Sequence, residues 1–420
     1  MTPEQNDRLT RVGPGTPMGA LMRRYWQPIA ASVDVNERTP TKLIKILGEE
    51  LVLYRNRSGG VGLIGPRCAH RNASLLYSVP EPNGVRCCYH GWLYDEKGVC
   101  IERPNEPKEL ANIVKIPSYP VQERGGLVFA YLGPEPVPLL PNWDVLAWPN
   151  VTRKISAAIL PCNWLQCMEN SLDPVHFEWL HRYYGTYEML RQDPSRKLDE
   201  WNATTARRGK HHVKLGFELT SYGIIKRRLL DGEKESDDHW RMGHPILFPN
   251  VLRVGMYDWH GLHYRVPMDD VTTLHIMVDL DLPKPNTQAE PQDSVPAKYW
   301  PLYDENNQLI QTFSGPHEPY HVVVQDQVAW IAQGAISDRT NEKLAATDIG
   351  IAYYRKLLSQ QMDLVEKGQD PMNVHRDADP DDCIVLPIEN ARYPGDGEGE
   401  TGGPFKDYVP KKPDYERVLK

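Results

Sequence analysis

Two short segments of the chain each carry a cysteine and a histidine close together. Cys68-Ala69-His70 is followed by sixteen residues and then by Cys87-Cys88-Tyr89-His90, which gives the pattern C-x-H-x16-C-x2-H. Thiolates and neutral imidazoles are common ligands of transition metals. Both segments lie in turn-rich sequence, so we expect two loops that meet. The pattern therefore predicts a four-ligand metal site formed by Cys68, His70, Cys87 and His90.

The way the ligands are shared between the loops indicates which metal is bound. Structural zinc sites usually take two cysteines from one C-x2-C arm. Here each loop supplies one Cys and one His. This arrangement is typical of a Rieske [2Fe–2S] cluster, in which one iron takes both cysteines and the other takes both histidines. The other five cysteines have no assigned role, and we expect them to be buried.

A second group of metal-binding side chains follows about eighty residues later. The segment Asn170-Ser-Leu-Asp173-Pro-Val-His176-Phe-Glu-Trp-Leu-His181 has the pattern N-x2-D-x2-H-x4-H. Two histidines and one carboxylate that leave open positions form the facial triad of non-haem Fe(II) oxygenases. The open face allows O2 and a substrate to approach the iron together.

The spacing of the two histidines restricts the local structure. In an ideal α-helix, residues five apart point about 140° away from each other. His176 and His181 can therefore share one iron only if the helix is irregular there or if they straddle the metal. Pro174 marks the start of this helix, so Asp173 could also serve as its N-cap.

The elements that must position these residues fall into two parts. Short strand-like runs with frequent Gly and Pro predict a small antiparallel β domain, and longer runs over about 210–282 predict a second antiparallel sheet. Helices are expected at 18–25, around 163–182 and at 341–366. The predicted class is α+β, with a central antiparallel sheet flanked by helices in the second part. The predicted division is a leader at 1–40, a cluster-binding domain at 41–145, a catalytic domain at 146–385 and an extended tail at 386–420.

Composition excludes several classes of protein. The chain has 420 residues with 48 basic and 56 acidic side chains, so its formal charge of −8 argues against nucleic-acid binding. No apolar stretch is long enough for a membrane span, and the polar N-terminus does not predict a signal peptide. Seven cysteines without an export signal favour the cytoplasm.

Taken together, the two patterns resemble the α subunit of Rieske non-haem iron oxygenases. Further stretches are similar to the phthalate-dioxygenase-like branch of that family, among them LTRVGPGTPMGALMRRYW, RCCYHGWLYDEKGVC, CNWLQCMENSLDPVHFEWLH and VQDQVAWIAQGAISDRT. The resemblance covers nearly the whole chain. It implies that His176 and His181 bind a mononuclear iron, with Asp326 of VQDQVAW as the third ligand. Asp338 and Asp348 are the alternatives that spacing alone does not separate.

The resemblance also implies roles for two neighbouring residues. Asp173 would bridge a Rieske histidine of one subunit to an iron-binding histidine of the next, which requires a homo-oligomer, expected to be a head-to-tail trimer. Asn170 would lie beside the iron.

The expected activity is that of a terminal oxygenase component. It would use O2 and electrons from a separate ferredoxin or flavin reductase, since no nucleotide-binding fingerprint is present and NAD(P)H could act only indirectly. The expected reaction is O-demethylation of a methoxylated aromatic carboxylate with release of formaldehyde. The alternative within the family is phthalate-type cis-dihydroxylation of a ring. The alternatives from another class are an electron carrier and a zinc protein. A basic group is expected in the pocket, but no substrate residue is assigned among Arg253, His260, Arg265 and the run Lys226-Arg227-Arg228.

Overall fold

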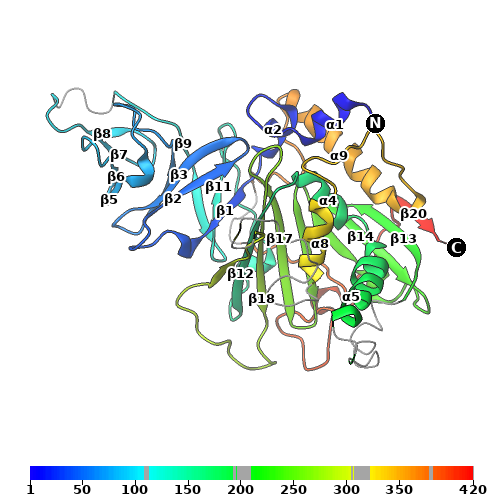
Figure 1. The fold of residues 1–420 in the computed structure, drawn as a ribbon. Helices are drawn as coiled ribbons and strands as arrows, with labels where there is room; N and C mark the ends of the chain where they lie inside the picture. Colours follow the sequence, from blue (N-terminus) through cyan, green and yellow to red (C-terminus); the bar gives the residue numbers. More distant parts are fainter. Residues whose placement is uncertain are drawn as a thin grey trace.

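The computed structural model describes residues 1–107, 113–192, 195, 210–303, 306, 322–377 and 382–419. Within these ranges the chain forms four β-sheets with helices packed around the largest one (Figure 1). This arrangement confirms the predicted α+β class, with a smaller β part first and a larger sheet-and-helix part after it.

Two small antiparallel sheets build the part that carries the first motif. Their strand orders are β2-β3-β4-β9 and β5-β6-β7-β8. The bounds are Thr41–Ile46, Glu49–Arg55, Val61–Ile64 and Ser118–Tyr119 for the first sheet, and Val79–Glu81, Gly84–Arg86, Leu93–Tyr94 and Cys100–Glu102 for the second. The motif loops follow β4 and β6, and the short helix η2 (Leu75–Tyr77) lies between them. A separate core beneath the loops contains Cys68, Cys87 and Tyr94.

The N-terminal segment is part of the folded body. Helices α1 (Pro3–Thr10) and α2 (Pro17–Met22) are followed by β1 (Gln27–Ala31) and η1 (Ser32–Asp34). β1 pairs with β11 (Leu127–Ala130), which also pairs with β10 (Val121–Arg124). The predicted helix at 18–25 is therefore shorter, and the segment predicted as a leader contributes a strand to a third sheet.

The largest sheet has the strand order β19-β12-β18-β17-β16-β15-β14-β13-β20. In chain order its strands are β12 (Thr152–Leu160), β13 (His212–Leu219), β14 (Gly223–Leu230), β15 (His244–Leu247), β16 (Val251–Met256), β17 (Trp259–Pro267), β18 (Thr273–Asp281), β19 (Ala297–Tyr299) and β20 (Tyr415–Val418). Neighbouring strands are antiparallel, except that β19 runs parallel to β12. Strands β13 to β18 match the predicted sheet over 210–282.

Helices cover this sheet and carry the second motif. They are α3 (Asp144–Ala147), α4 (Trp164–Ser171), η4 (Phe177–Tyr184), α5 (Gly185–Gln192), α7 (Asp238–Arg241), α8 (Val322–Ile331), η5 (Ala346–Asp348), α9 (Ile349–Glu366) and η6 (Gly403–Phe405). Figure 1 shows α4 and α8 side by side across one face of the sheet. Among the described residues, no helix has both the length and the apolar character needed to cross a membrane.

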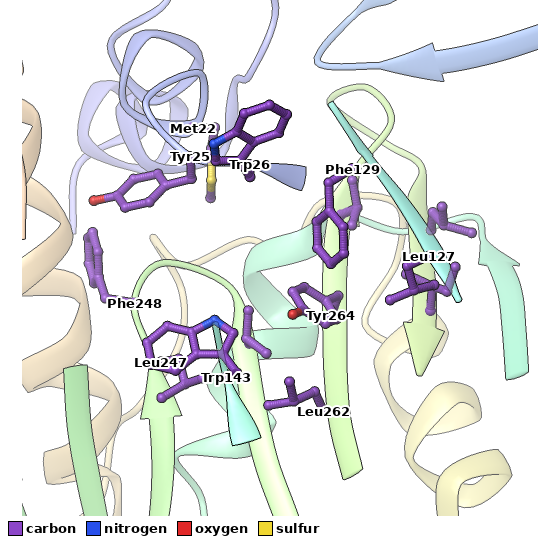
Figure 2. Packing of buried hydrophobic residues seen from close by; sticks show 14 of the residues in the cluster. Met22, Tyr25, Trp26, Leu127, Phe129, Trp143, Leu247, Phe248, Leu262 and Tyr264 are labelled. Carbon is purple, nitrogen blue, oxygen red and sulfur yellow. The ribbon is translucent and has the colours of Figure 1, made fainter. Parts of the chain in front are cut away.

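The main core joins the N-terminal segment to the large sheet. Trp26 follows α2, Phe129 belongs to β11, and Tyr264 belongs to β17, yet all three are buried in one cluster (Figure 2). The alternating apolar side chains of β17 and β18 supply the sheet's contribution to this core, as the period of two in a strand requires.

The residues after 385 pack on their own chain. The sequence predicts an extended tail there, but Leu386, Ile388 and Tyr393 are buried in the main core. Strand β20 then pairs with β13 at the edge of the large sheet. Apolar residues spaced among the glycines and prolines of this segment explain why it folds back instead of remaining in solvent.

Candidate metal centres

The two loops of the first motif close in the same way. The backbone N–H of Asn72 donates to the carbonyl of Cys68 at 2.9 Å, and that of Gly91 donates to the carbonyl of Cys87 at 3.0 Å. Asn72 and Gly91 both have left-handed backbone angles, with φ of 56° and 76°. Such turns suit Asn and Gly. Each loop therefore closes in a single turn that contains both its cysteine and its histidine.

The four predicted cluster ligands form a layered donor set. Cys68 and Cys87 are buried, whereas His70 and His90 are exposed. The two imidazole rings lie 4.5 Å apart, and that of His70 stacks on Trp92 with 4.9 Å between ring centres. Two inner sulfurs and two outer nitrogens fit a binuclear cluster in which each iron takes one kind of ligand.

Tyr94 holds one of the sulfurs. Its hydroxyl oxygen accepts a hydrogen bond from the backbone N–H of Ala69 at 3.0 Å, which leaves its own proton for Cys68 Sγ, 3.2 Å away. Burial raises the pKa of the Cys68 thiol, and the Tyr94 hydroxyl opposes that rise. A hydrogen bond to a cluster sulfur also tunes the reduction potential. Tyr94 was not predicted from the sequence, although its place in the strand after the second loop was a usable signal.

The helix that carries the second motif is irregular, as the histidine spacing requires. The helical path is interrupted after α4, at Asp173-Pro174, because the residue before a proline is disfavoured in the helical conformation. Residues Phe177–Tyr184 then form η4, which is a π-helix with hydrogen bonds five residues apart. One wider turn brings His176 and His181 to the same side, with their ring centres 5.0 Å apart.

Asp326 of α8 meets the two histidines. Its Oδ1 atom lies 3.2 Å from Nε2 of His181 and 3.6 Å from Nε2 of His176. These three side chains offer ligand atoms that all lie within 4.8 Å of one another. Nε2 of His181 is buried and makes no hydrogen bond. Such an orphaned ring nitrogen beside a carboxylate fits a bound metal ion.

The alternatives to Asp326 lie elsewhere. Asp338 is exposed and accepts hydrogen bonds from Thr340 and Asn341. Asp348 accepts the backbone N–H of Ala345 at 2.7 Å. Both carboxylates therefore serve local turns, and the structure brings only Asp326 of the three candidates to the histidines.

Neighbouring amides surround the Asp326 carboxylate and the His181 ring. Oε1 of Gln325 lies 2.7 Å from Nδ1 of His181, and Nδ2 of Asn170 lies 3.4 Å from Oδ1 of Asp326. Burial raises the pKa of Asp326, but the nearby rings of His181 and His176 outweigh burial and hold it below its usual value. The carboxylate is therefore ionised and ready to bind a cation.

Asp173 uses its two carboxylate oxygens in different ways. Oδ1 accepts the backbone N–H of Val175 at 2.8 Å, which is a capping bond. Oδ2 lies 3.7 Å from Nδ1 of His176, a ring atom with no hydrogen-bond partner. Asp173 is thus placed to cap the helix and to face His176 at once.

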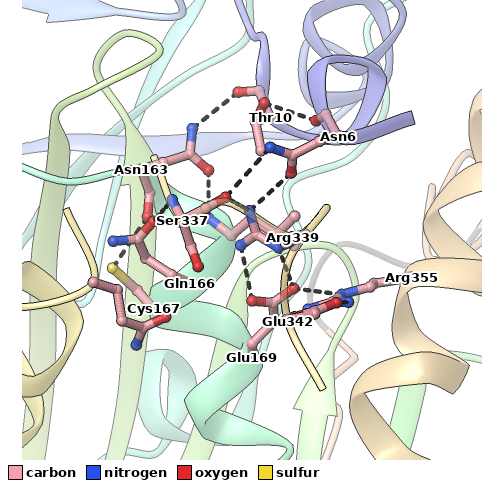
Figure 3. Close-up of polar contacts among 12 residues, drawn as sticks. Asn6, Thr10, Asn163, Gln166, Cys167, Glu169, Ser337, Arg339, Glu342 and Arg355 are labelled. Carbon is pink, nitrogen blue, oxygen red and sulfur yellow. Dashed lines mark hydrogen bonds and ion pairs between the residues drawn. The ribbon is translucent and has the colours of Figure 1, made fainter. Parts of the chain in front are cut away.

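A buried polar network fixes α4 against the segment that contains α8 (Figure 3). Gln166 donates to the carbonyls of Trp330 and Gly334, both at 2.8 Å. Glu169 accepts two hydrogen bonds from Arg339 at 2.8 Å and one from Arg355 at 2.6 Å. These contacts hold Asn170 and Asp326 in register across the two helices.

Most of the basic candidates in the large sheet have structural partners. Arg253 pairs with the buried Asp144 at 3.1 Å, and Arg227 and Arg228 pair with Glu218 and Glu389. Lys226 differs, since its ammonium group makes no hydrogen bond or ion pair with another described residue. Burial and then the charge of Arg228 lower its pKa to about 8, while Asp173 and Asp326 oppose that shift.

The remaining cysteines divide into two groups. Cys100, Cys162 and Cys167 are buried as predicted, but Cys88 and Cys383 are exposed. The prediction was wrong for these two because both lie in loops, where a small side chain need not be covered. All seven cysteines are free.

Comparison with known proteins agrees with the two centres. Residues 25–120 match the Rieske [2Fe-2S] domain, and residues 130–385 match the domain described as "LigXa C-terminal domain like". The oxygenase subunit of 5,5'-dehydrodivanillate O-demethylase from Sphingobium sp. is 39% identical over 92% of this chain and 86% of its own length. This chain belongs to the Rieske non-haem iron oxygenases.

This Rieske oxygenase is also similar to a second curated relative and to a solved structure. The oxygenase subunit of tert-butanol monooxygenase / tert-amyl alcohol desaturase from Aquincola tertiaricarbonis is 46% identical over 84% of this chain and 75% of its own. The oxygenase of carbazole 1,9a-dioxygenase, solved in complex with ferredoxin, has the same fold, with a TM-score of 0.57 at 20% identity over 89% of this chain and 99% of that one.

Membership of this family identifies the cofactors. The Rieske oxygenase is an oxidoreductase with a [2Fe–2S] cluster and a mononuclear non-haem iron, and it works with separate electron-transfer proteins. The donor sets described above fit both groups.

Proposed function

We propose that this chain is the oxygenase component of an O-demethylase that acts on a methoxylated aromatic carboxylate of the 5,5'-dehydrodivanillate kind. The observation that carries the oxygenase part is the partly buried triad of His176, His181 and Asp326, in which Nε2 of His181 is buried without a hydrogen-bond partner. The substrate class is supported by the relative that is 39% identical over most of the chain.

In this proposal Cys68, His70, Cys87 and His90 hold the cluster, and the triad holds the iron. The bound iron supplies activation of O2 by electrons that reach it from the cluster. The chain's own residues orient the ligands: Gln325 fixes the ring of His181, and Asn170 lies against Asp326. Hydroxylation of the substrate's methyl group gives a hemiacetal, which loses formaldehyde and leaves a phenol.

Lys226 is the proposed partner for a substrate carboxylate. It is buried on β14 and has no anionic partner at bonding distance in the described part of the chain. Burial lowers the pKa of Lys226, and the charges of Asp173 and Asp326 act to raise it, which supports a position within electrostatic range of the proposed iron site. A buried cation without a counter-ion is costly, and a bound carboxylate would supply one.

We further propose that the chain forms a head-to-tail homotrimer. Strands β6 and β7, between which His90 lies, are at the opposite side of the molecule from α4 and α8 (Figure 1). Electrons would therefore pass from the cluster of one subunit to the iron of the next, through Asp173. The exposed aromatic side chains of Trp179 and Tyr183 on η4 suit a contact with a neighbour.

Three finer points remain proposals. The proposed division is at 1–40, 41–145, 146–385 and 386–420, with the first and last segments packed on the folded body instead of forming a leader and an extended tail. A ferredoxin or flavin reductase is the proposed electron donor. The cytoplasm is the proposed location, supported by seven free cysteines.

Product analysis tests the reaction. With a reducing partner, O2 and 5,5'-dehydrodivanillate, we expect formaldehyde and a new phenol in equal amounts. Phthalate offered in parallel tests the alternative reaction. If phthalate gives a cis-diol and the methoxylated acid gives no formaldehyde, the chain is a ring dihydroxylase and the proposed demethylation is wrong.

Subunit complementation tests the trimer. Chains with Cys87→Ser lack the cluster and chains with His181→Ala lack the iron. Co-assembled chains should regain activity that neither variant has alone. At some interfaces the intact cluster of a His181→Ala chain would then lie next to the intact iron site of a Cys87→Ser chain. Equal inactivity of the mixed assembly would mean that electrons stay within one chain.

A further inference from the structure

The hairpin of β7 and β8 places an arginine beside a proposed cluster ligand. Leu93 pairs with Glu102 in this hairpin, so Trp92 and Arg103 lie at the same end of it. The guanidinium carbon of Arg103 lies over the ring of Trp92, 5.2 Å from the ring centre. The ring of Trp92 also stacks on that of His70, with 4.9 Å between ring centres and 6° between ring planes. Trp92 therefore contacts both a cation and a proposed ligand of the cluster.

Arg103 has no partner for its charge in the described part of the chain. Its Nε and Nη2 atoms are buried and make no hydrogen bond. The neighbouring Arg86 is the opposite case, since it pairs with Glu81 at 3.0 Å and with Glu102 at 2.8 Å. A cation that is partly removed from water without a counter-ion is costly. An anionic group close to Arg103 would offset that cost.

The charge of Arg103 acts on the core beneath the two motif loops. This core contains Cys68, Cys87 and Cys100. Burial raises the pKa of the Cys100 thiol to about 11, and the charge of Arg103 opposes that rise. The two stacking contacts place the guanidinium carbon within roughly 10 Å of the His70 ring, a separation at which a partly buried charge still interacts appreciably.

A Rieske cluster changes its net charge when it is reduced. Two ferric ions, two sulfides, two thiolates and two neutral imidazoles sum to zero, so one added electron makes the group an anion. A nearby cation stabilises the reduced form more than the oxidised form, and it therefore raises the reduction potential. Net charge is one of the properties that set the potential of such clusters.

We propose that Arg103, held against Trp92, provides the counter-charge of the reduced cluster and raises its reduction potential. Arg103 is thus a positioning residue for electron entry, because it acts on the cluster through its charge and not as a ligand. This inference goes beyond the proposed reaction. It rests on the proposed cluster ligands and is independent of which substrate the enzyme takes.

The ratio of reduced to oxidised cluster in the holoenzyme tests this proposal. The protein is equilibrated with a redox buffer poised at the wild-type midpoint potential, and the reduced fraction is measured from the Rieske EPR signal. Arg103→Gln and Arg103→Met both remove the charge, so either variant that retains the cluster is sufficient. Each should lower the ratio by about 3–10-fold, which corresponds to about 30–60 mV for a one-electron couple.

Two further variants separate charge from shape and from surface effects. Arg103→Lys keeps the charge and should stay within about twofold of the wild-type ratio. Arg67→Gln is the matched control, because Arg67 directly precedes Cys68 but is exposed to solvent. Its effect should be below about twofold and should vanish at about 0.5 M salt, whereas the effect of Arg103→Gln should persist.

Three results would overturn the proposal. The first is an unchanged ratio in a neutral Arg103 variant that keeps the EPR signal. The second is a fall in Arg103→Lys as large as that in Arg103→Gln, since the shape of the side chain and not its charge would then set the ratio. The third is a wild-type protein without a Rieske signal, which would contradict the proposed cluster ligands as well.

Discussion

Oε1 of Gln325 lies 2.7 Å from Nδ1 of His181, so the residue that precedes Asp326, one proposed iron ligand, also orients His181, another. His181 then presents Nε2 towards Asp326, 3.2 Å away. One turn of α8 therefore provides a ligand and the support for a second ligand. Such supporting contacts hold a histidine ring in the orientation and tautomer that a metal needs.

Replacement of Gln325 by Ala should weaken iron binding by about 10–100-fold, because the ring of His181 loses its support. Gln325→Glu retains an acceptor and should bind iron nearly as well as the wild type. The measurement is mononuclear iron retained during dialysis against a graded chelator. Gln333→Ala, at an exposed position just after the same helix, is the control. Equal iron loss from Gln325→Ala and Gln333→Ala would refute the orienting role.

Replacement of Asp173 by Asn should slow electron transfer from the cluster to the iron by about 10–100-fold while both metals stay bound. The rate is followed as reoxidation of the reduced cluster on mixing with substrate and O2. Asp173→Ser keeps a capping oxygen but cannot reach a second ring, so it should be as slow as Asp173→Asn. Restoration of the rate by serine would mean that Asp173 only caps the turn before η4. Asp338→Asn, in an exposed turn, should leave the rate unchanged.

Replacement of Lys226 by Met should raise KM for the aromatic carboxylate by about 10–100-fold, because a charge-assisted hydrogen bond is lost. The methyl ester of the same acid should show no such change. Lys154→Met, at an exposed position on β12, serves as the control. An unchanged KM in Lys226→Met would remove Lys226 from substrate binding.

Replacement of Glu169 by Gln should lower the free energy of unfolding by about 3–5 kcal/mol, because it leaves Arg339 and Arg355 buried without their shared counter-ion. Urea unfolding monitors this change. Glu342→Gln breaks only the contact with Arg355 at a more exposed site and should cost about 1 kcal/mol. Similar losses in the two variants would show that the network in Figure 3 is not centred on Glu169.

Acid should destabilise the fold through His260. Nδ1 of His260 accepts from Arg253 at 2.7 Å, and its Nε2–H donates to the carbonyl of Arg392 at 2.7 Å. Burial and then the charge of Arg253 lower its pKa to about 2. The unfolded chain binds this proton below about pH 6.5, so the stabilisation is complete above that pH and is lost as pH falls towards 2.

The slope of unfolding free energy against pH between about 6 and 4.5 should be shallower in His260→Gln, by up to about 1.4 kcal/mol per pH unit. His211→Gln, which replaces an exposed histidine, should keep the wild-type slope. Parallel slopes in all three proteins would contradict this assignment.

The sequence pointed to the proposed metal ligands more directly than to the residues that support them. Cys68 and His181 stand out because few side chains bind metals and their spacing is distinctive. Tyr94 and Gln325 were missed, since a tyrosine or glutamine acquires its role only when the fold places it beside a ligand. The segment VQDQ held a signal in retrospect, because amides on both sides of a ligand can support neighbouring rings.

Features of the fold that depend on local sequence were predictable, whereas those that depend on distant contacts were not. The five-residue histidine spacing predicted either an irregular helix or two histidines that straddle the metal, and the π-helix at Phe177–Tyr184 agrees with the first alternative. The fate of the residues after 385 depended on distant partners, since Leu386 and Tyr393 are buried only by the assembled core. Pairing of β20 with β13 joins residues about two hundred positions apart, which no local pattern reveals.

The most direct test of the account is the iron and acid-labile sulfide content of the purified chain, measured with the EPR spectrum of its reduced form. The wild type should contain about three irons and about two sulfides per chain and give a Rieske signal. His181→Ala should lose about one iron and keep both the sulfide and the signal. Zinc in place of iron, or an iron content that His181→Ala leaves unchanged, would contradict the assignment of the two centres.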